Sequence, residues 1–179
     1  MMIASEPSSA IKMQTEEITF DLKGEFTKDI RVYCFVCTGN TCRSPMAAAL
    51  LNHYGAPRGI FAFSRGIYAD SGAPISENAA TALKDAGIEP TGRNDYNNHR
   101  ATQFTKEDFE NCDGVFAISP SHADALIMAF PEYAAKIRVL GDIKDPFMGD
   151  IECYRDCLSD IRDAVRTHFP FIFDDENNG

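Results

Sequence analysis

The chain has 179 residues, of which 44% are hydrophobic, and this is enough for one domain with a substantial apolar core. Its 17 basic and 27 acidic residues give a formal net charge of −10, which argues against nucleic acid as a partner. Nothing in the sequence approaches the roughly 18 consecutive apolar residues of a membrane-spanning helix, and no leader-like segment opens it, so we expect a cytoplasmic protein without a membrane partner. The sequence points to no particular oligomeric state.

The first part of the chain differs in character from the rest. Residues 1–29 are polar and weakly patterned, and we expect them to form an N-terminal extension to a folded domain over residues 30–179. Within the extension, residues 18–22 alternate well enough to predict a short strand. The domain opens with residues 30–36, a run of β-branched and aromatic residues that predicts a buried strand.

Helices and strands then alternate. Pro45 directly after Ser44 predicts the start of a helix with Ser44 as its cap, and Gly55 predicts its end. Residues 59–64 read as a second strand, and residues 76–86 as a helix that a following glycine stops.

The second half of the chain continues this alternation. A strand is predicted over residues 113–118, a helix capped near Ser119 or Ser121 follows it, residues 136–140 form a short strand, and the last helix covers residues 151–168. Strands separated by helices predict an α/β fold, namely an open, doubly wound, parallel sheet of four strands with helices on both faces. In such sheets, ligands bind beyond the carboxyl ends of the strands.

The segment that carries chemistry lies at this place, between the first strand and the first helix, and reads CTGNTCRS over residues 37–44. A loop that enters a helix N-terminus directs several backbone N–H groups into one concavity, and the helix dipole adds positive charge there, so the loop favours a phosphate-like dianion. We expect Cys37 to be the nucleophile and Arg43 to be the clamp on the phosphate. The residues expected to bind the phosphate are Thr38, Gly39, Asn40, Thr41, Cys42 and Ser44.

The chemistry of Cys37 and Arg43 follows from their positions. The field of the helix N-terminus and a nearby guanidinium favour the thiolate form of Cys37, and the hydroxyl of Ser44 can add a hydrogen bond to that sulfur. A thiolate can attack phosphorus and form a phosphocysteine that water later hydrolyses. The planar guanidinium of Arg43 matches two oxygens of the transferring phosphoryl group.

In this segment the chain resembles the low-molecular-weight protein-tyrosine-phosphatase family, whose phosphate loop follows the pattern C-x-G-N-x-C-R-S-P. Every fixed letter of the pattern is present from Cys37 to Pro45. Asp145, followed by a proline and Phe147, resembles the loop that carries the family's general acid, and the resemblance covers roughly residues 31–168. It implies a metal-free and cofactor-free hydrolase that acts on phosphorylated proteins, with Asp145 giving a proton to the leaving group and later taking one from water.

Other segments fit the resemblance less closely. Residues 64–66 read Ser-Arg-Gly where family members usually have Ser-Ala-Gly, and His99 with Arg100 resembles a common His-Arg-Ser segment. The resemblance implies phosphotyrosine as the substrate, but Thr41 matches the bacterial protein-arginine phosphatases, which makes phosphoarginine the alternative. Tyr68 and Phe147 are expected at the mouth of the pocket.

Other interpretations of the loop and its cysteines remain. A reversible disulfide from Cys42 to the nucleophile, which the resemblance suggests, and simple packing under the loop are equally open. The thioredoxin-coupled arsenate reductases use almost the same loop, but they need two further cysteines, and Cys112 stands alone in the relevant stretch. A non-enzymatic anion-binding module would leave the joint presence of a cysteine, an arginine and an aspartate unexplained.

A structural zinc site is the other possibility that the cysteines raise. Cys34 and Cys37 form a C-x-x-C pair, while Cys153 and Cys157 lie one helical turn apart. Cys34 falls inside a buried strand, and the second pair is expected to face the core, so we predict no metal.

Overall fold

A computed structural model of the chain describes residues 29–178. The short strand predicted over residues 18–22 lies outside the described residues. In chain order the main elements are β1 Arg31–Cys37, α1 Arg43–Gly55, β2 Ile60–Gly66, α2 Glu77–Asp85, α3 Lys106–Glu110, β3 Gly114–Ala117, α4 Pro120–Ala129, β4 Ile137–Val139 and α5 Ile151–His168. Short 3-10 segments follow several of them, the longest covering Pro170–Asn178.

The four strands form one parallel sheet in the order β2-β1-β3-β4. β1 lies between β2 and β3 and pairs with β2 along its whole length, from Arg31 opposite Ile60 to Cys37 opposite Gly66. The chain winds outward from β1 in both directions, because β2 lies on one side of it and β3 and β4 lie on the other. The predicted open, doubly wound α/β sheet is therefore confirmed.

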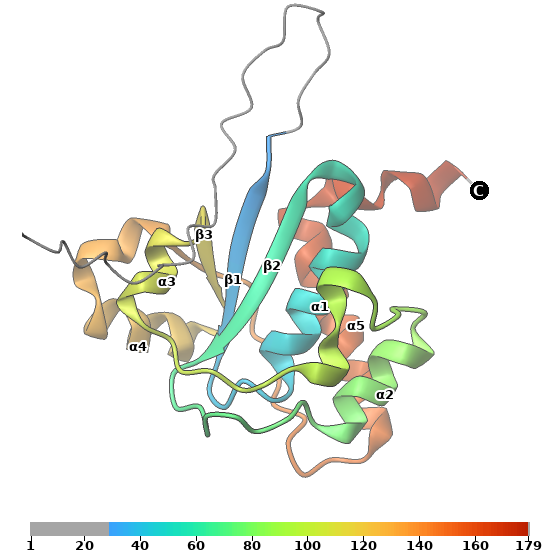
Figure 1. Ribbon diagram of the computed structural model, residues 1–179, viewed down its shortest axis with the longest axis horizontal. Helices are drawn as coiled ribbons and strands as arrows, with labels where there is room; N and C mark the ends of the chain where they lie inside the picture. The colour runs from blue at the N-terminus through green and yellow to red at the C-terminus, as the bar shows by residue number, and fades with distance from the viewer. Residues whose placement is uncertain (1–28, 179) are drawn as a thin grey trace, which may run out of the picture.

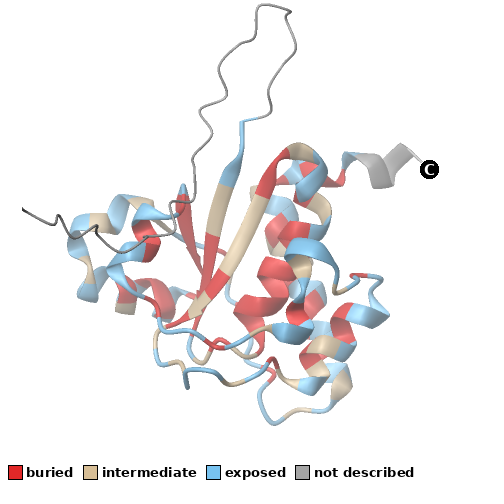
Figure 2. Ribbon diagram, in the orientation of Figure 1, coloured by how far each residue is buried: buried red, intermediate tan, exposed pale blue. Residues whose placement is uncertain are grey.

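Helices cover both faces of this sheet (Figure 1). α1, α2 and α5 pack on one face around a core that includes Phe35 and Phe116, whose rings stack with centroids 5.6 Å apart. α3 and α4 lie on the other face, over a smaller core that includes Cys34 and Val36. Alternate residues of β1 thus enter opposite cores, which is why the strand is a continuous apolar run in the sequence. Burial increases along β1 toward its carboxyl end (Figure 2).

The start of α1 differs from the sequence prediction. We predicted that Ser44 caps the helix and that Pro45 opens it, but α1 begins at Arg43 and Cys42 occupies the cap position. A proline fits here because the first-turn N–H groups of a helix have no partners within it. The earlier start places Ser44 inside the first turn, where its hydroxyl bonds to the preceding loop instead of capping the helix.

The loops after β1, β2, β3 and β4 gather at the carboxyl edge of the sheet, as the topology requires. A hydrogen bond shows how close two of these loops are. The amide of Tyr68, just after β2, donates to the carbonyl of Thr38, just after β1, at 2.9 Å. Among residues 29–178, no helix is both long enough and apolar enough to cross a membrane.

Candidate active site

The loop from Cys37 to Arg43 leaves the end of β1 and enters α1 at the carboxyl edge of the sheet. Cys37 is buried, and its Sγ lies 3.0 Å from the Oγ of Ser44. Within the described chain, the backbone N–H groups of residues 39–42 donate to no protein acceptor. These free donors at a helix N-terminus form a cradle of partial positive charge that suits a phosphate group.

Asn40 holds the loop in shape from its centre. Its φ of 59° is left-handed, a conformation that asparagine tolerates better than most residues. The amide nitrogen of its side chain donates to the hydroxyls of Ser44 and Ser64, each at 2.9 Å, and its side-chain oxygen accepts from the amide of Thr102 at 2.9 Å. Asn40 is fully buried, so these hydrogen bonds fix a backbone turn that would otherwise be strained.

His99 and the last residue of β2, Gly66, complete this support. The Nε2 of His99 donates to the carbonyl of Asn40 at 2.7 Å, and burial lowers the pKa of His99. Gly66 lies so close to the loop that an added Cβ would come within 2.6 Å of the carbonyl oxygen of Thr38. Glycine is therefore required at this position, because any larger residue would push the loop away from β2.

Arg43 connects the loop to the segment that contains Asp145. Its Nη2 lies 3.2 Å from Oδ2 of Asp145, and its Nη1 donates to the carbonyl of Ile143 at 3.2 Å. The guanidinium is almost fully buried, whereas the Asp145 side chain is 52% exposed. The structure thus brings a buried cation, a solvent-accessible carboxyl group and the thiol of Cys37 to one edge of the sheet.

The start of α4 adds two residues that the sequence did not single out for the site, the N-cap Ser119 and His122 in the first turn. Ser119 donates from its Oγ to the carbonyl of Ile143 at 3.2 Å, the same carbonyl that Arg43 contacts. The Nε2 of His122 lies 2.9 Å from the Oγ1 of Thr38, and burial, followed by the charge of Arg43, lowers the pKa of His122 to about 4. The sequence indicates both residues only through their position, because they come soon after β3, a strand whose carboxyl end lies beside that of β1.

The remaining predicted residues take different places. The Oγ1 of Thr41 lies 3.7 Å from the Sγ of Cys42, and Cys42 is buried with its Sγ 3.5 Å from the hydroxyl of Tyr154. Burial, followed by that contact, raises the pKa of Tyr154 to about 12. Tyr68 and Phe147 are 78% and 67% exposed, which leaves them free at the surface.

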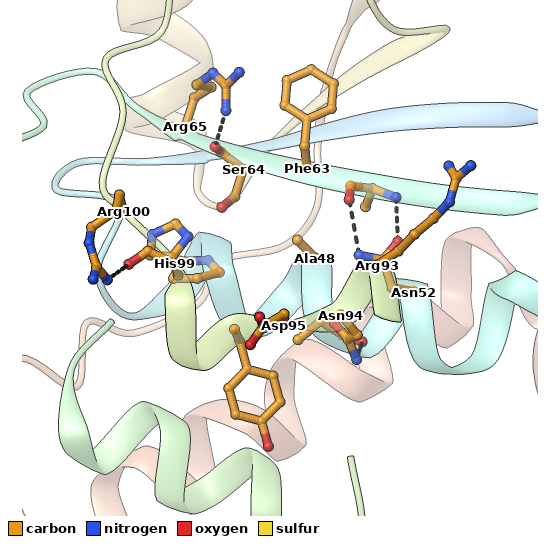
Figure 3. Close-up of a pocket in the computed structure, with 14 residues that line it drawn as sticks. Ala48, Asn52, Phe63, Ser64, Arg65, Arg93, Asn94, Asp95, His99 and Arg100 are labelled. Carbon is orange, nitrogen blue, oxygen red and sulfur yellow. Dashed lines mark hydrogen bonds between the residues drawn. The ribbon is translucent and has the colours of Figure 1, made fainter. Parts of the chain in front are cut away.

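Two hollows flank the loop and its acidic partner. One, of about 350 Å³, lies between the segment of residues 144–149 and α5 and includes Asp145 and Phe147 in its wall. The other, of about 200 Å³, lies behind the loop between α1, β2 and residues 93–100 (Figure 3). Ser64 and His99, two of the residues that hydrogen-bond to Asn40, line this second hollow.

The cysteines outside the loop are spread over the fold. Cys34 and Cys157 are buried, as predicted, but Cys153 is exposed, which corrects the expectation that both cysteines of α5 face the core. The pair is one turn apart, and α5 packs only part of its surface on the sheet. Residues 29–178 contain no group of three or more His, Cys, Asp or Glu side chains that could hold a metal ion.

The lowered pKa values of His99 and His122 predict how stability depends on pH. In the folded state both histidines have a pKa below the ordinary histidine pKa of 6.5, so they bind protons less readily than in the unfolded state. Their contribution to stability is therefore fully present above about pH 6.5 and is lost as the pH falls, down to about pH 4 for His122.

Thermal unfolding of the wild type and of His122→Gln, measured from pH 7 to pH 4, tests this expectation. We expect the Tm of the wild type to fall more steeply than that of the variant, since glutamine does not titrate. Each kcal/mol of lost stability corresponds to about 2–4 °C in Tm for a chain of this size. Parallel curves for the two proteins would contradict the assignment to His122, because the carboxyl groups that titrate in this range are common to both.

Comparison with known proteins places this site in a family. The model of the family described as low molecular weight phosphotyrosine protein phosphatase matches residues 32–176. A protein-arginine-phosphatase of Geobacillus stearothermophilus is 40% identical over 139 residues, which are 73% of this chain and 88% of that protein. A probable low molecular weight protein-tyrosine-phosphatase of Ralstonia solanacearum is 31% identical over 148 residues, which are 80% and 97% of the two chains.

Solved structures give the same result. The crystal structure of the low molecular weight protein tyrosine phosphatase from T. tengcongensis has a TM-score of 0.71 and 33% sequence identity to this chain, covering 78% of this chain and 98% of that one. The family match includes both the phosphate loop and the segment around Asp145. The family predicted from the loop motif is therefore confirmed: the chain belongs to the low molecular weight phosphotyrosine protein phosphatase family and is a phosphomonoester hydrolase of the protein-tyrosine-phosphatase type.

Proposed function

We propose that the chain hydrolyses phosphotyrosine in proteins through a phosphocysteine intermediate. Cys37 is the nucleophile, Arg43 binds the phosphoryl oxygens, and Asp145 is first the general acid and then the general base. The observation that carries this proposal is the arrangement at the N-terminus of α1, where Ser44 lies 3.0 Å from the sulfur of Cys37 and Arg43 lies 3.2 Å from Asp145.

The first step transfers the phosphoryl group to sulfur. The thiolate of Cys37 attacks phosphorus while the bond from phosphorus to the tyrosine oxygen breaks, and the carboxyl group of Asp145 gives its proton to that oxygen. Negative charge grows on the equatorial oxygens, where the guanidinium of Arg43 and the free N–H groups of residues 39–42 can stabilise it.

The second step restores the enzyme. Water attacks the phosphorus of the phosphocysteine, Asp145 takes a proton from this water, and the sulfur leaves as a thiolate. The hydroxyl of Ser44 suits this step because it lies within hydrogen-bond distance of the sulfur and can donate to the thiolate as it forms. The exposed position of Asp145 supports both of its roles, since water and leaving groups reach it from solvent.

The rest of the loop binds the phosphate in this proposal. These residues are Thr38, Gly39, Asn40, Thr41, Cys42 and Ser44, and the reaction as written needs neither a metal nor a cofactor. Residues 30–179 form the phosphatase domain, and residues 1–29 are an extension outside the family match. A cytoplasmic location agrees with a nucleophile that must remain a reduced thiol, and the charge of −10 argues against nucleic acid as a partner.

Phosphoarginine is the second candidate substrate, and Thr41 is the observation that favours it. The relative from Geobacillus stearothermophilus is named as a protein-arginine-phosphatase. The hydroxyl of Thr41 makes one weak contact, at 3.7 Å to the Sγ of Cys42, and is otherwise available to a substrate. A hydroxyl at this position can bind a phosphoguanidinium group or the attacking water, whereas an aliphatic side chain cannot.

Parallel kinetics on phosphotyrosine and phosphoarginine peptides test the substrate assignment. We expect the wild type to hydrolyse both, with the higher kcat/KM on phosphotyrosine. Thr41→Ile should shift the ratio of the two kcat/KM values toward phosphotyrosine by about ten-fold, because it removes a hydroxyl that the guanidinium can use. The backbone should remain in place, since the carbonyl of Thr41 accepts from the amide of Ser76 at 2.9 Å whatever the side chain.

Thr41→Ser is the matched control, because it keeps the hydroxyl and removes a methyl group. It should leave the ratio close to that of the wild type. If Thr41→Ile leaves the ratio unchanged as well, Thr41 has no selective role, and phosphotyrosine stands as the simpler assignment. Absence of activity on both peptides would contradict the proposed function itself.

A further inference from the structure

His122 is a buried histidine beside the phosphate loop that the proposed mechanism does not use. It is the third residue of α4, which follows β3 directly, so the topology places it at the carboxyl edge of the sheet. Its side chain is 4% exposed, and its Nε2 lies 2.9 Å from the Oγ1 of Thr38. Thr38 is the residue that directly follows the nucleophile Cys37.

The other ring nitrogen of His122 has an unusual environment. Among the described residues, Nδ1 is the buried side-chain polar atom that has no hydrogen-bond partner. A buried polar atom without a partner lowers stability, and an apolar side chain could fill the same space without this cost. Packing therefore does not explain why an imidazole occupies this position. The hydrogen bond to Thr38 does explain it.

The charge state of His122 suits a hydrogen-bonding role. Burial and the neighbouring guanidinium of Arg43 keep the ring neutral at neutral pH, although the carboxylate of Asp145 acts in the opposite direction. A neutral imidazole can donate to the hydroxyl of Thr38 or accept from it, depending on the tautomer. It does so without adding a second cation that would compete with Arg43 for Asp145 or for the phosphate.

Thr38 needs such a contact because packing does not hold it. Its side chain is exposed, while its carbonyl is fixed by the amide of Tyr68 at 2.9 Å and by the close approach of Gly66. The hydrogen bond to His122 fixes the side chain as well. Together these contacts determine the direction in which the chain leaves Cys37.

We propose that His122 is a positioning residue, which acts through Thr38 to hold Cys37 in line with the phosphorus atom. This inference rests on the proposed phosphocysteine mechanism. In-line geometry is required in the transition state more than in the ground-state complex, so loss of the contact should lower kcat more than it raises KM. Vanadate, which adopts the geometry of the transition state, should lose more affinity than inorganic phosphate.

Three variants test the inference: His122→Ala removes the partner, His122→Gln offers an amide that can reach the same hydroxyl, and Thr38→Val removes the hydroxyl and keeps the shape. Each is measured for kcat and KM on para-nitrophenyl phosphate, for the inhibition constants of vanadate and phosphate, and for Tm. We expect His122→Ala to lower kcat by about three- to ten-fold and to weaken vanadate by a similar factor, with phosphate less affected. His122→Gln should recover most of both losses.

A double variant separates the hydrogen bond from other effects. If His122 acts through Thr38, the combination of His122→Ala with Thr38→Val should be no slower than the worse of the two single variants. Losses that multiply would overturn the inference. So would a His122→Ala enzyme with the kcat and vanadate affinity of the wild type, or a loss that follows Tm alone and that glutamine does not recover.

The same measurements distinguish this inference from the function on which it rests. A wild-type enzyme without phosphatase activity would overturn both. A fully active wild type whose His122→Ala variant is unchanged would overturn the role of His122 and leave the roles of Cys37, Arg43 and Asp145 intact.

Discussion

Replacing Cys37 by serine is expected to lower kcat by about four orders of magnitude or more and to leave phosphate binding largely intact. A serine hydroxyl is far less ionised than a thiol in the same field, so the attacking species is nearly absent. The fold should survive because serine is slightly smaller than cysteine and can keep a hydrogen bond to Ser44, which lies 3.0 Å from the sulfur in the wild type.

Steady-state kinetics on an aryl phosphate measure the loss, and isothermal titration with inorganic phosphate measures binding to the same preparation. Cys153→Ser is the matched control, because it makes the same atomic change at an exposed thiol outside the loop. It should have the activity of the wild type. A Cys37→Ser enzyme that turns over at a comparable rate would end the assignment of the nucleophile.

Arg43→Lys is expected to lower kcat by about two to three orders of magnitude, even though the charge is conserved. The guanidinium contacts two partners at once, the carbonyl of Ile143 through Nη1 and the carboxylate of Asp145 through Nη2, both at 3.2 Å. A lysine has one nitrogen and cannot hold both while it also reaches two phosphoryl oxygens. The loss should appear chiefly in kcat, because charge on these oxygens increases in the transition state.

Arg31→Lys serves as the control for this substitution. Arg31 lies at the opposite end of β1 and makes an exposed ion pair of 3.7 Å with Asp113, a contact that contributes little. We expect its kcat to match the wild type. Retention of most of the kcat in Arg43→Lys, under conditions where both variants are folded, would reduce Arg43 to a structural role.

The local sequence was sufficient to predict that a strand, a loop and a helix carry the nucleophile. The apolar run before Cys37 predicted β1, the alternation of strands and helices predicted the parallel sheet, and the last helix was placed at the residues where α5 is found. These features depend on periodicity and on residues near one another in the chain, which a sequence displays directly.

Two local features were misread or missed. α1 starts at Arg43 because the loop itself, and not a serine cap, determines where the helix begins. The short helix α3 was not predicted, although Thr105 and Asp108 form a capping box at its start. That box has aspartate in place of the usual glutamate or glutamine, which makes the signal weak in the sequence.

By itself, the sequence determined the family, the parallel sheet and the phosphate loop, because each depends on residues close together in the chain. The resemblance implied a role for Asp145, but its contact with Arg43, 102 residues earlier in the chain, is seen only in the tertiary structure. The tertiary structure alone decided that His122, 84 residues beyond Thr38, meets the loop. The physical reason is that the strands are parallel, so their carboxyl ends meet at one edge and bring these side chains together. Sequence spacing cannot show which of the residues after each strand are buried there and which, like Tyr68, remain exposed.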